Sequence, residues 1–168
     1  IDALRHKLAQ IQDAKQKIET PTAGERRIVT VMFADLSGFT ALAERMDPEA
    51  VRDLMNACFA RLVPPIEKFG GVVDKFVGDQ VMALFGAPRA HENDPERALR
   101  AALEMMDALA TFNTERGFEL GMHIGINTGL VITGEIGTGE RQEYSVMGDA
   151  VNVAARLGDV SGWGEILV

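Results

Sequence analysis

Apolar and polar positions change period several times along the chain, and these changes predict its elements. Residues 26–34 are mostly β-branched and apolar, which is typical of a buried strand. An apolar face with helical spacing follows Asp47-Pro48, a pair that favours a helix start, and Gly70-Gly71 ends that helix. A second helix is predicted from Asp94-Pro95 to Phe112. The other predicted elements are strands over 72–77, 81–85, 120–127, 130–136, 144–147 and 165–168, a short helix entered from the turn 37–40, and a helix over 148–157.

The order of these elements is β-α-β-β-α-β with additions. It predicts an α+β fold with a ferredoxin-like core, an antiparallel sheet and helices on one face. Tight turns are predicted at Gly78-Asp79 and at Thr128-Gly129, each joining two strands, and a further turn is predicted over 137–140.

The first residues predict a short N-terminal helix whose apolar positions alternate in steps of three and four. These positions are Ile1, Leu4, Leu8, Ile11 and Ile18. One interpretation is the end of a parallel coiled coil that joins two chains to an upstream regulatory domain. The other is an amphipathic helix packed on its own domain. Residues 1–24 are therefore assigned to this helix and a linker, and residues 25–168 to the main domain.

Composition narrows the possible partners. The chain has 168 residues, which suits one domain, and its net charge of −8 argues against nucleic acid as a partner while leaving a small anion possible. A single cysteine, Cys58, suits a reducing compartment, so we expect a cytoplasmic domain, within a full-length protein that could be membrane-attached. The absence of an initial methionine and the apolar end over 165–168 indicate a piece of a longer protein.

Two aspartates occupy positions where folding does not require a charge. Asp35 ends an apolar strand and Asp79 lies in the following hairpin turn, although Asp is common enough in turns to explain Asp79 alone. In a split βαββαβ sheet these strands are neighbours, so both carboxylates could bind Mg²⁺ or Mn²⁺ together with substrate phosphates. The turn over 36–40 opens a helix whose free N–H groups could hold phosphate. This combination favours phosphoryl transfer from a nucleotide.

Four motifs support a more specific interpretation. They are FADLSGFT at 33–40, KFVGD at 75–79, GINTG at 125–129 and YSVMGDAVNVAAR at 144–156. Their order and content resemble the class III adenylyl/guanylyl cyclase catalytic domain of the bacterial type. The resemblance covers about residues 26–168, and four ordered motifs are far more specific than any one of them.

The resemblance implies a head-to-tail homodimer with catalytic sites at the subunit interface. One subunit would bind two metal ions, Mg²⁺ or Mn²⁺, through Asp35, Asp79 and the Leu36 carbonyl. The amides of the following turn would hold the triphosphate; these belong to Ser37, Gly38, Phe39 and Thr40. The other subunit would bring Lys75 and Ser145 to the base, Asn152 to the ribose and Arg156 to the α-phosphate.

The implied reaction converts ATP to 3′,5′-cyclic AMP and pyrophosphate. Lys75 can only donate hydrogen bonds, which suits adenine N1 and opposes the N1–H of guanine. Ser145 is less decisive, because a hydroxyl can accept from adenine N6–H or donate to guanine O6. The alternatives are a guanylate or mixed-specificity cyclase and a catalytically weak dimerisation or regulatory module. A diguanylate-forming domain would carry a different signature at the hairpin, which reads FVGDQ here.

Two departures from the family pattern affect the expected activity. His123 stands where relatives usually have a phosphate-binding arginine, and it could be either a weaker phosphate partner or a strand histidine without substrate contact. The family's last strands carry a phosphate-contacting lysine and would lie beyond Val168. Activity is therefore better supported for the complete protein than for this chain.

Overall fold

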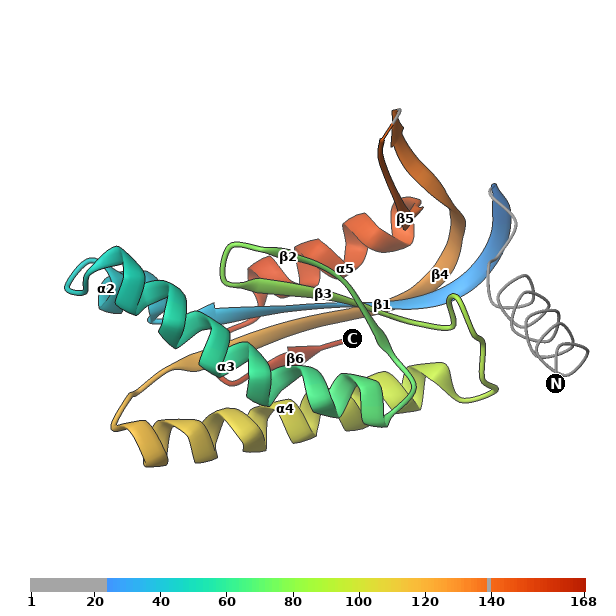
Figure 1. Ribbon diagram of the computed structural model, residues 1–168. Coiled ribbons are helices and arrows are strands. Elements are labelled where there is room, and N and C mark those ends of the chain that lie inside the picture. The colour runs from blue at the N-terminus through green and yellow to red at the C-terminus, as the bar shows by residue number, and fades with distance from the viewer. Residues whose placement is uncertain (1–23, 139) are drawn as a thin grey trace, which may run out of the picture.

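A computed structural model describes residues 24–168 except residue 139, and it shows a six-stranded sheet with helices on both faces (Figure 1). The strand order is β2-β3-β1-β4-β5, and β6 lies beside β4. The N-terminal helix predicted over residues 1–24 lies outside the described residues, apart from Gly24. The elements are β1 (Glu25–Ser37), α2 (Phe39–Ala43), α3 (Pro48–Lys68), β2 (Val72–Val77), β3 (Gln80–Phe85), α4 (Asp94–Arg116), β4 (Gly121–Thr138), β5 (Arg141–Met147), α5 (Asp149–Val160) and β6 (Ile166–Leu167).

Strand β1 lies at the centre of the sheet and supplies both hydrophobic cores. It pairs antiparallel with β3 on one edge and with β4 along its whole length on the other. Because successive side chains of a strand point to opposite faces, Met32, Ala34 and Leu36 join one core. Val29, Val31 and Phe33 join the other core.

The two helices of the βαββαβ core, α3 and α4, cover one face and bury Leu62, Ile66 and Met105 against it. This confirms the predicted α+β class, the ferredoxin-like order and the placement of these two helices on one face. The added helix α5 differs, because it covers the opposite face through Ala150 and Ala154 (Figure 1). The added strand β6 runs parallel to β4, so the sheet is mixed rather than purely antiparallel.

The predicted turn at Thr128-Gly129 is wrong, because both residues lie within strand β4. It runs without a break from Gly121 to Thr138, and Thr128 and Gly129 both pair with β1. The glycines of this segment serve close packing instead: a Cβ at Gly125 would overlap the backbone of Ala154 and Gly158, and one at Gly129 would lie 2.9 Å from the Cβ of Ala150. A glycine inside a strand often marks a place where another backbone approaches closely.

The far end of β4 also differs from the prediction. Strand β4 extends to Thr138 and β5 begins at Arg141, three residues before the predicted strand start. The two strands therefore form a longer antiparallel arm, in which Ser145 pairs with Gly134. No helix among the described residues is both long and apolar enough to cross a membrane.

The close contact between β4 and α5 generates a stability prediction. We expect Gly125→Ala to lower the free energy of unfolding by about 3 kcal/mol, because an added methyl group meets backbone that cannot rotate away. Gly162→Ala is the matched control, because its Cβ would meet only the flexible carboxylate of Glu165, at 3.3 Å. Urea denaturation of both variants measures the difference, and equal stabilities would contradict the packing described here.

Candidate functional site

The sheet brings the two predicted metal-binding aspartates together. Asp35 lies near the end of β1, between its ladder partners Gln80 and His123. The Leu36 N–H donates to the Asp79 carbonyl at 3.3 Å, which ties the β2–β3 turn to the end of β1. The hairpin turn therefore holds Asp79 beside Asp35, as its place in the split sheet predicts.

Asp35 is placed where its negative charge is poorly compensated. Its Oδ1 atom is buried and makes no hydrogen bond, and its Oδ2 lies 3.6 Å from His123 Nε2. Burial raises the pKa of Asp35 from its ordinary 3.8 to about 6. The charge of Asp79, a side-chain hydrogen bond that Asp79 shares with the protonated form, and the charge of Asp159 add to the increase, and His123 opposes it. An unpaired carboxylate oxygen beside a second carboxylate is a costly arrangement that a cation would relieve.

His123 connects this site to the end of α5. Its Nδ1 lies 2.6 Å from the Gly158 carbonyl oxygen and must donate there, because a carbonyl only accepts. Its other nitrogen, Nε2, therefore faces Asp35. The Ser161 hydroxyl lies 3.3 Å from Nδ1. The ring is thus held by backbone at the carboxylate site.

The loop predicted to hold phosphate begins directly after Asp35. Ser37 ends β1, and Gly38 has φ 83°, a left-handed conformation that favours glycine. Phe39 is buried and anchors the five-residue helix α2, and the Leu42 N–H donates to the Gly38 carbonyl. The left-handed Gly38 therefore lets α2 begin directly after β1, four residues beyond Asp35.

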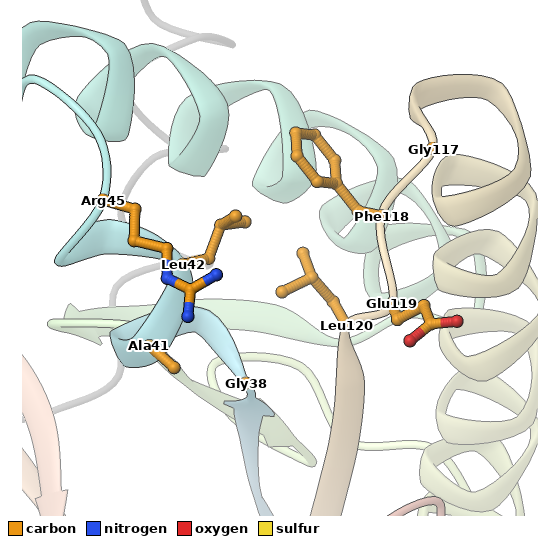
Figure 2. A pocket seen from close by; sticks show the side chains of 8 residues that line it. All are labelled: Gly38, Ala41, Leu42, Arg45, Gly117, Phe118, Glu119 and Leu120. Atoms are coloured by element: carbon orange, nitrogen blue, oxygen red, sulfur yellow. The ribbon is translucent and has the colours of Figure 1, made fainter.

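A pocket of about 470 Å³ lies between α2 and the segment from Gly117 to Leu120 (Figure 2). Its walls carry Leu42 and Phe118, and Arg45 and Glu119 supply its charged groups. Gly38 is the one residue that it shares with the predicted phosphate loop, and neither Asp35 nor Asp79 lines it. This pocket is therefore distinct from the carboxylate site.

The residues predicted to contact a base form a second group, on β2 and β5. The Ser145 hydroxyl donates to Asp74 Oδ2 at 2.8 Å, and Lys75 Nζ lies 3.3 Å from the same oxygen. The pairing of β2 with β3 shifts register between Val73 and Lys75, so one extra residue is inserted at Asp74. Without this bulge, Asp74 and Lys75 would point to opposite faces of the strand.

The residues predicted to act on the ribose and the α-phosphate form a third group. Asn152 and Arg156 are exposed and lie one helical turn apart on α5. The buried side of the same helix is a row of small residues, Ala150, Ala154 and Gly158, which lets α5 lie close to β4. The Asn127 amide donates to the Ala150 carbonyl at 3.2 Å and strengthens that contact.

The three groups remain separate within one chain. Among the residues that the structure describes, no hydrogen bond or ion pair joins the carboxylates to Lys75, Asn152 or Arg156. Within the same residues, no three or more His, Cys, Asp or Glu side chains form a cluster that could hold a metal. Two carboxylates nevertheless suit a hard cation such as Mg²⁺, which usually keeps waters and binds substrate phosphates as well.

Two further acidic residues belong to these groups, although the sequence motifs do not single them out. Asp74 accepts from Ser145, and Asp159 lies close enough to raise the pKa of Asp35. Asp74 depends on a bulge and Asp159 on the packing of α5, and neither feature has a sequence signal here. An Asp-Lys pair in a strand ordinarily predicts one side chain on each face.

Comparison with known proteins identifies relatives of this chain. The family model for the adenylate and guanylate cyclase catalytic domain matches residues 22–168. The adenylate cyclase of Anabaena cylindrica is 37% identical over an alignment of 150 residues, and the match covers 84% of this chain and 29% of that protein. The chain therefore spans less than a third of this relative, which is a much longer protein.

Solved structures of both substrate types are also similar. The guanylyl cyclase Cya2 has a TM-score of 0.81 and 38% identity, over 86% of this chain and 76% of its own. The adenylyl cyclase CyaB from P. aeruginosa has a TM-score of 0.81 and 36% identity, over 84% of this chain and 76% of its own. The chain belongs to the class III adenylate and guanylate cyclase catalytic domain family, whose members are lyases.

The electrostatics of Asp35 generate a second prediction. Above about pH 6 the carboxylate is ionised in the folded and unfolded states, and the folded state carries the full penalty of burial and of Asp79. We expect Asp35→Asn to raise Tm at pH 7.5 in EDTA by about 3 °C or more. The gain should shrink as the pH falls from about 6 towards 3.8, because the wild-type carboxyl then becomes protonated.

Calorimetry of Asp35→Asn and of the control Asp53→Asn, an exposed carboxylate on α3, measures this effect. A lower Tm for Asp35→Asn at pH 7.5, or an equal gain at pH 4, would contradict the assignment of an uncompensated charge.

Proposed function

We propose that the chain is the catalytic domain of an adenylate cyclase, which forms 3′,5′-cyclic AMP and pyrophosphate from ATP in intracellular signalling. The observation that carries this proposal is the proximity of the Asp35 and Asp79 carboxylates beside the loop predicted to hold phosphate. Asp35 Oδ1 is buried there without a hydrogen-bond partner. The donor-only ammonium of Lys75 favours ATP over GTP.

Two Mg²⁺ or Mn²⁺ ions would be held by the carboxylates of Asp35 and Asp79 and by the Leu36 carbonyl. The donor set fits, because hard cations prefer oxygen ligands and Asp35 has a free buried oxygen. When bound, such ions supply charge neutralisation for the triphosphate and make the ribose 3′-hydroxyl more acidic.

The residues of the chain would position the nucleotide for an intramolecular reaction. The backbone amides of Ser37–Thr40 bind the triphosphate, and Asn152 hydrogen-bonds the ribose. The ribose 3′-hydroxyl loses its proton to solvent as its oxygen forms a bond to the α-phosphorus. The bond from that phosphorus to the oxygen that bridges to the β-phosphate breaks, and pyrophosphate leaves. Arg156 donates to the α-phosphate oxygens as their charge grows in the transition state, where a preorganised donor is most effective.

The three groups would meet when two chains assemble head to tail. Within one chain they remain apart, and Asn152 and Arg156 extend into solvent on α5. Large apolar side chains are also exposed on β2 and on the β4–β5 arm, at Phe76, Val77, Ile136 and Met147. Exposed apolar groups of this kind favour an interface with another protein surface. A second copy would cover them and complete each site from both chains.

A guanylate or mixed-specificity cyclase is the second candidate. Two observations favour it: the similarity to the guanylyl cyclase Cya2, and a serine at position 145, where a hydroxyl alone does not determine the base. A catalytically weak regulatory module is less well supported, because Asp35, Asp79, Lys75, Asn152 and Arg156 are all present. We further propose that this catalytic domain is cytoplasmic and is controlled by a regulatory domain that precedes it in the full-length protein.

Nucleotide turnover tests the proposal directly. With Mn²⁺ present, we expect the protein to form cyclic AMP from ATP faster than cyclic GMP from GTP, measured by product chromatography. Asp79→Ala should lower the rate at least about a hundredfold, because a metal ligand is lost, whereas the control Asp53→Ala should retain activity. Faster cyclic GMP formation would contradict the choice of base, and an active Asp79→Ala would contradict the metal assignment.

Mixing inactive variants tests the shared site. Asp79→Ala and Arg156→Ala should each be inactive alone, because each removes one contribution from both sites of a homodimer. In an equal mixture that is allowed to exchange subunits, half of the dimers are mixed and each has one intact site, so about a quarter of wild-type activity should return. The control mixes Asp79→Ala with Asp35→Ala, whose defects lie on the same side of the site. Recovery there, or none in the first mixture, would exclude a head-to-tail site.

A further inference from the structure

The contact between Asp74 and Ser145 bears on the choice of base, which the hydroxyl of Ser145 leaves open. A serine hydroxyl has one hydrogen and can donate once. In this structure that hydrogen is directed to Asp74 Oδ2, at 2.8 Å. An ionised carboxylate has no hydrogen of its own and can only accept, so the direction of this hydrogen bond is determined.

Asp74 is well placed to maintain that contact. Its side chain is only 3% exposed, and Ser145 is also 3% exposed, so water competes little for either group. Lys75 Nζ lies 3.3 Å from the same oxygen and is 42% exposed, which leaves other ammonium hydrogens available to a ligand. The bulge in β2 allows the adjacent Asp74 and Lys75 to make this contact.

We propose that Asp74 is a positioning residue that sets the preference for adenine by holding the hydroxyl hydrogen of Ser145. The inference rests on the proposed function, because it concerns the base of the nucleotide at that site. With its hydrogen engaged, Ser145 offers a base only lone pairs. It can accept from adenine N6–H, but it has no hydrogen for guanine O6.

In this proposal Asp74 does not contact the base itself. Its side chain is covered, and its Oδ2 already accepts from Ser145 and lies 3.3 Å from the Lys75 ammonium. A carboxylate that contacted guanine directly would accept from N1–H and would favour GTP. If Asp74 positions Ser145, removing its carboxylate lowers the preference for ATP over GTP. If Asp74 contacted guanine directly, removing it would raise that preference.

The test compares the ATP-to-GTP ratio of kcat/KM in the wild-type protein and in Asp74 variants with Mn²⁺. We expect Asp74→Ala to lower this ratio about tenfold, because the freed hydroxyl can then donate to guanine O6. Asp74→Asn should keep most of the preference, because its amide oxygen still accepts from Ser145. The control Asp53→Ala, an exposed carboxylate on α3, should leave the ratio unchanged. An unchanged or higher ratio for active Asp74→Ala would overturn the inference.

A second variant keeps the test independent of whether Asp74→Ala folds. Ser145→Ala should lower kcat/KM for ATP more than for GTP, because the wild-type hydroxyl accepts from adenine N6–H and offers guanine no hydrogen. A selective loss with GTP would show that Ser145 donates to guanine and would overturn the inference. If turnover is too slow to measure, Kd values for ATP and GTP from titration calorimetry provide the same comparison.

The wild-type ratio separates the inference from the proposed function. A wild-type preference for GTP would contradict adenylate cyclase activity, whereas a preference for ATP that Asp74→Ala does not alter would contradict only the role of Asp74. A protein that neither turns over nor binds either nucleotide would contradict both.

Discussion

Strand β1 has neighbours on both edges and a hydrophobic core on both faces, and the rest of the structure depends on this position. Its alternation sends Met32 and Ala34 towards α3 and α4, and Val31 and Phe33 towards α5. A shift of one residue in its pairing would reverse both sets at once, so its register is strongly determined. Asp35 follows these apolar residues, so the same register carries its carboxyl to the hairpin turn of Asp79 and to His123.

The carboxylate site shows how the fold supports a group that weakens it. Asp35 is partly buried, lacks a partner for Oδ1 and lies near Asp79 and Asp159, so its ionised form is unfavourable. The surrounding sheet tolerates this charge because β1 is held by backbone pairing on both sides. Functional carboxylates often lie where folding alone would not place them, and the raised pKa of Asp35 fits that pattern. A cation of the proposed kind would relieve this unfavourable charge.

Much of this structure follows from local patterns in the sequence. The period of apolar residues predicts β1, α3, the β2–β3 hairpin and α4 in the correct order, and adjacency in a split sheet predicts that Asp35 and Asp79 meet. The continuity of β4 does not follow, because glycine signals a turn and a close approach alike. Only the packing of α5 shows that Gly125 and Gly129 make room for a helix. The bulge at Asp74 has no local signal either, since it depends on how β2 pairs with β3.

The close approach of α5 to β4 and the bulge in β2 lie at the parts of the chain assigned to the nucleotide. Close approach of α5 to β4 presents Asn152 and Arg156 outward from a helix whose other side is held by backbone contacts. The bulge in β2 gathers Asp74 and Lys75 around one oxygen, where regular alternation would separate them. Regular pairing of β1 therefore accounts for the carboxylate group, whereas a close contact between helix and strand and a bulge account for the other two. The period of apolar residues predicts the first of these features and neither of the others, because both depend on how one element packs or pairs with another.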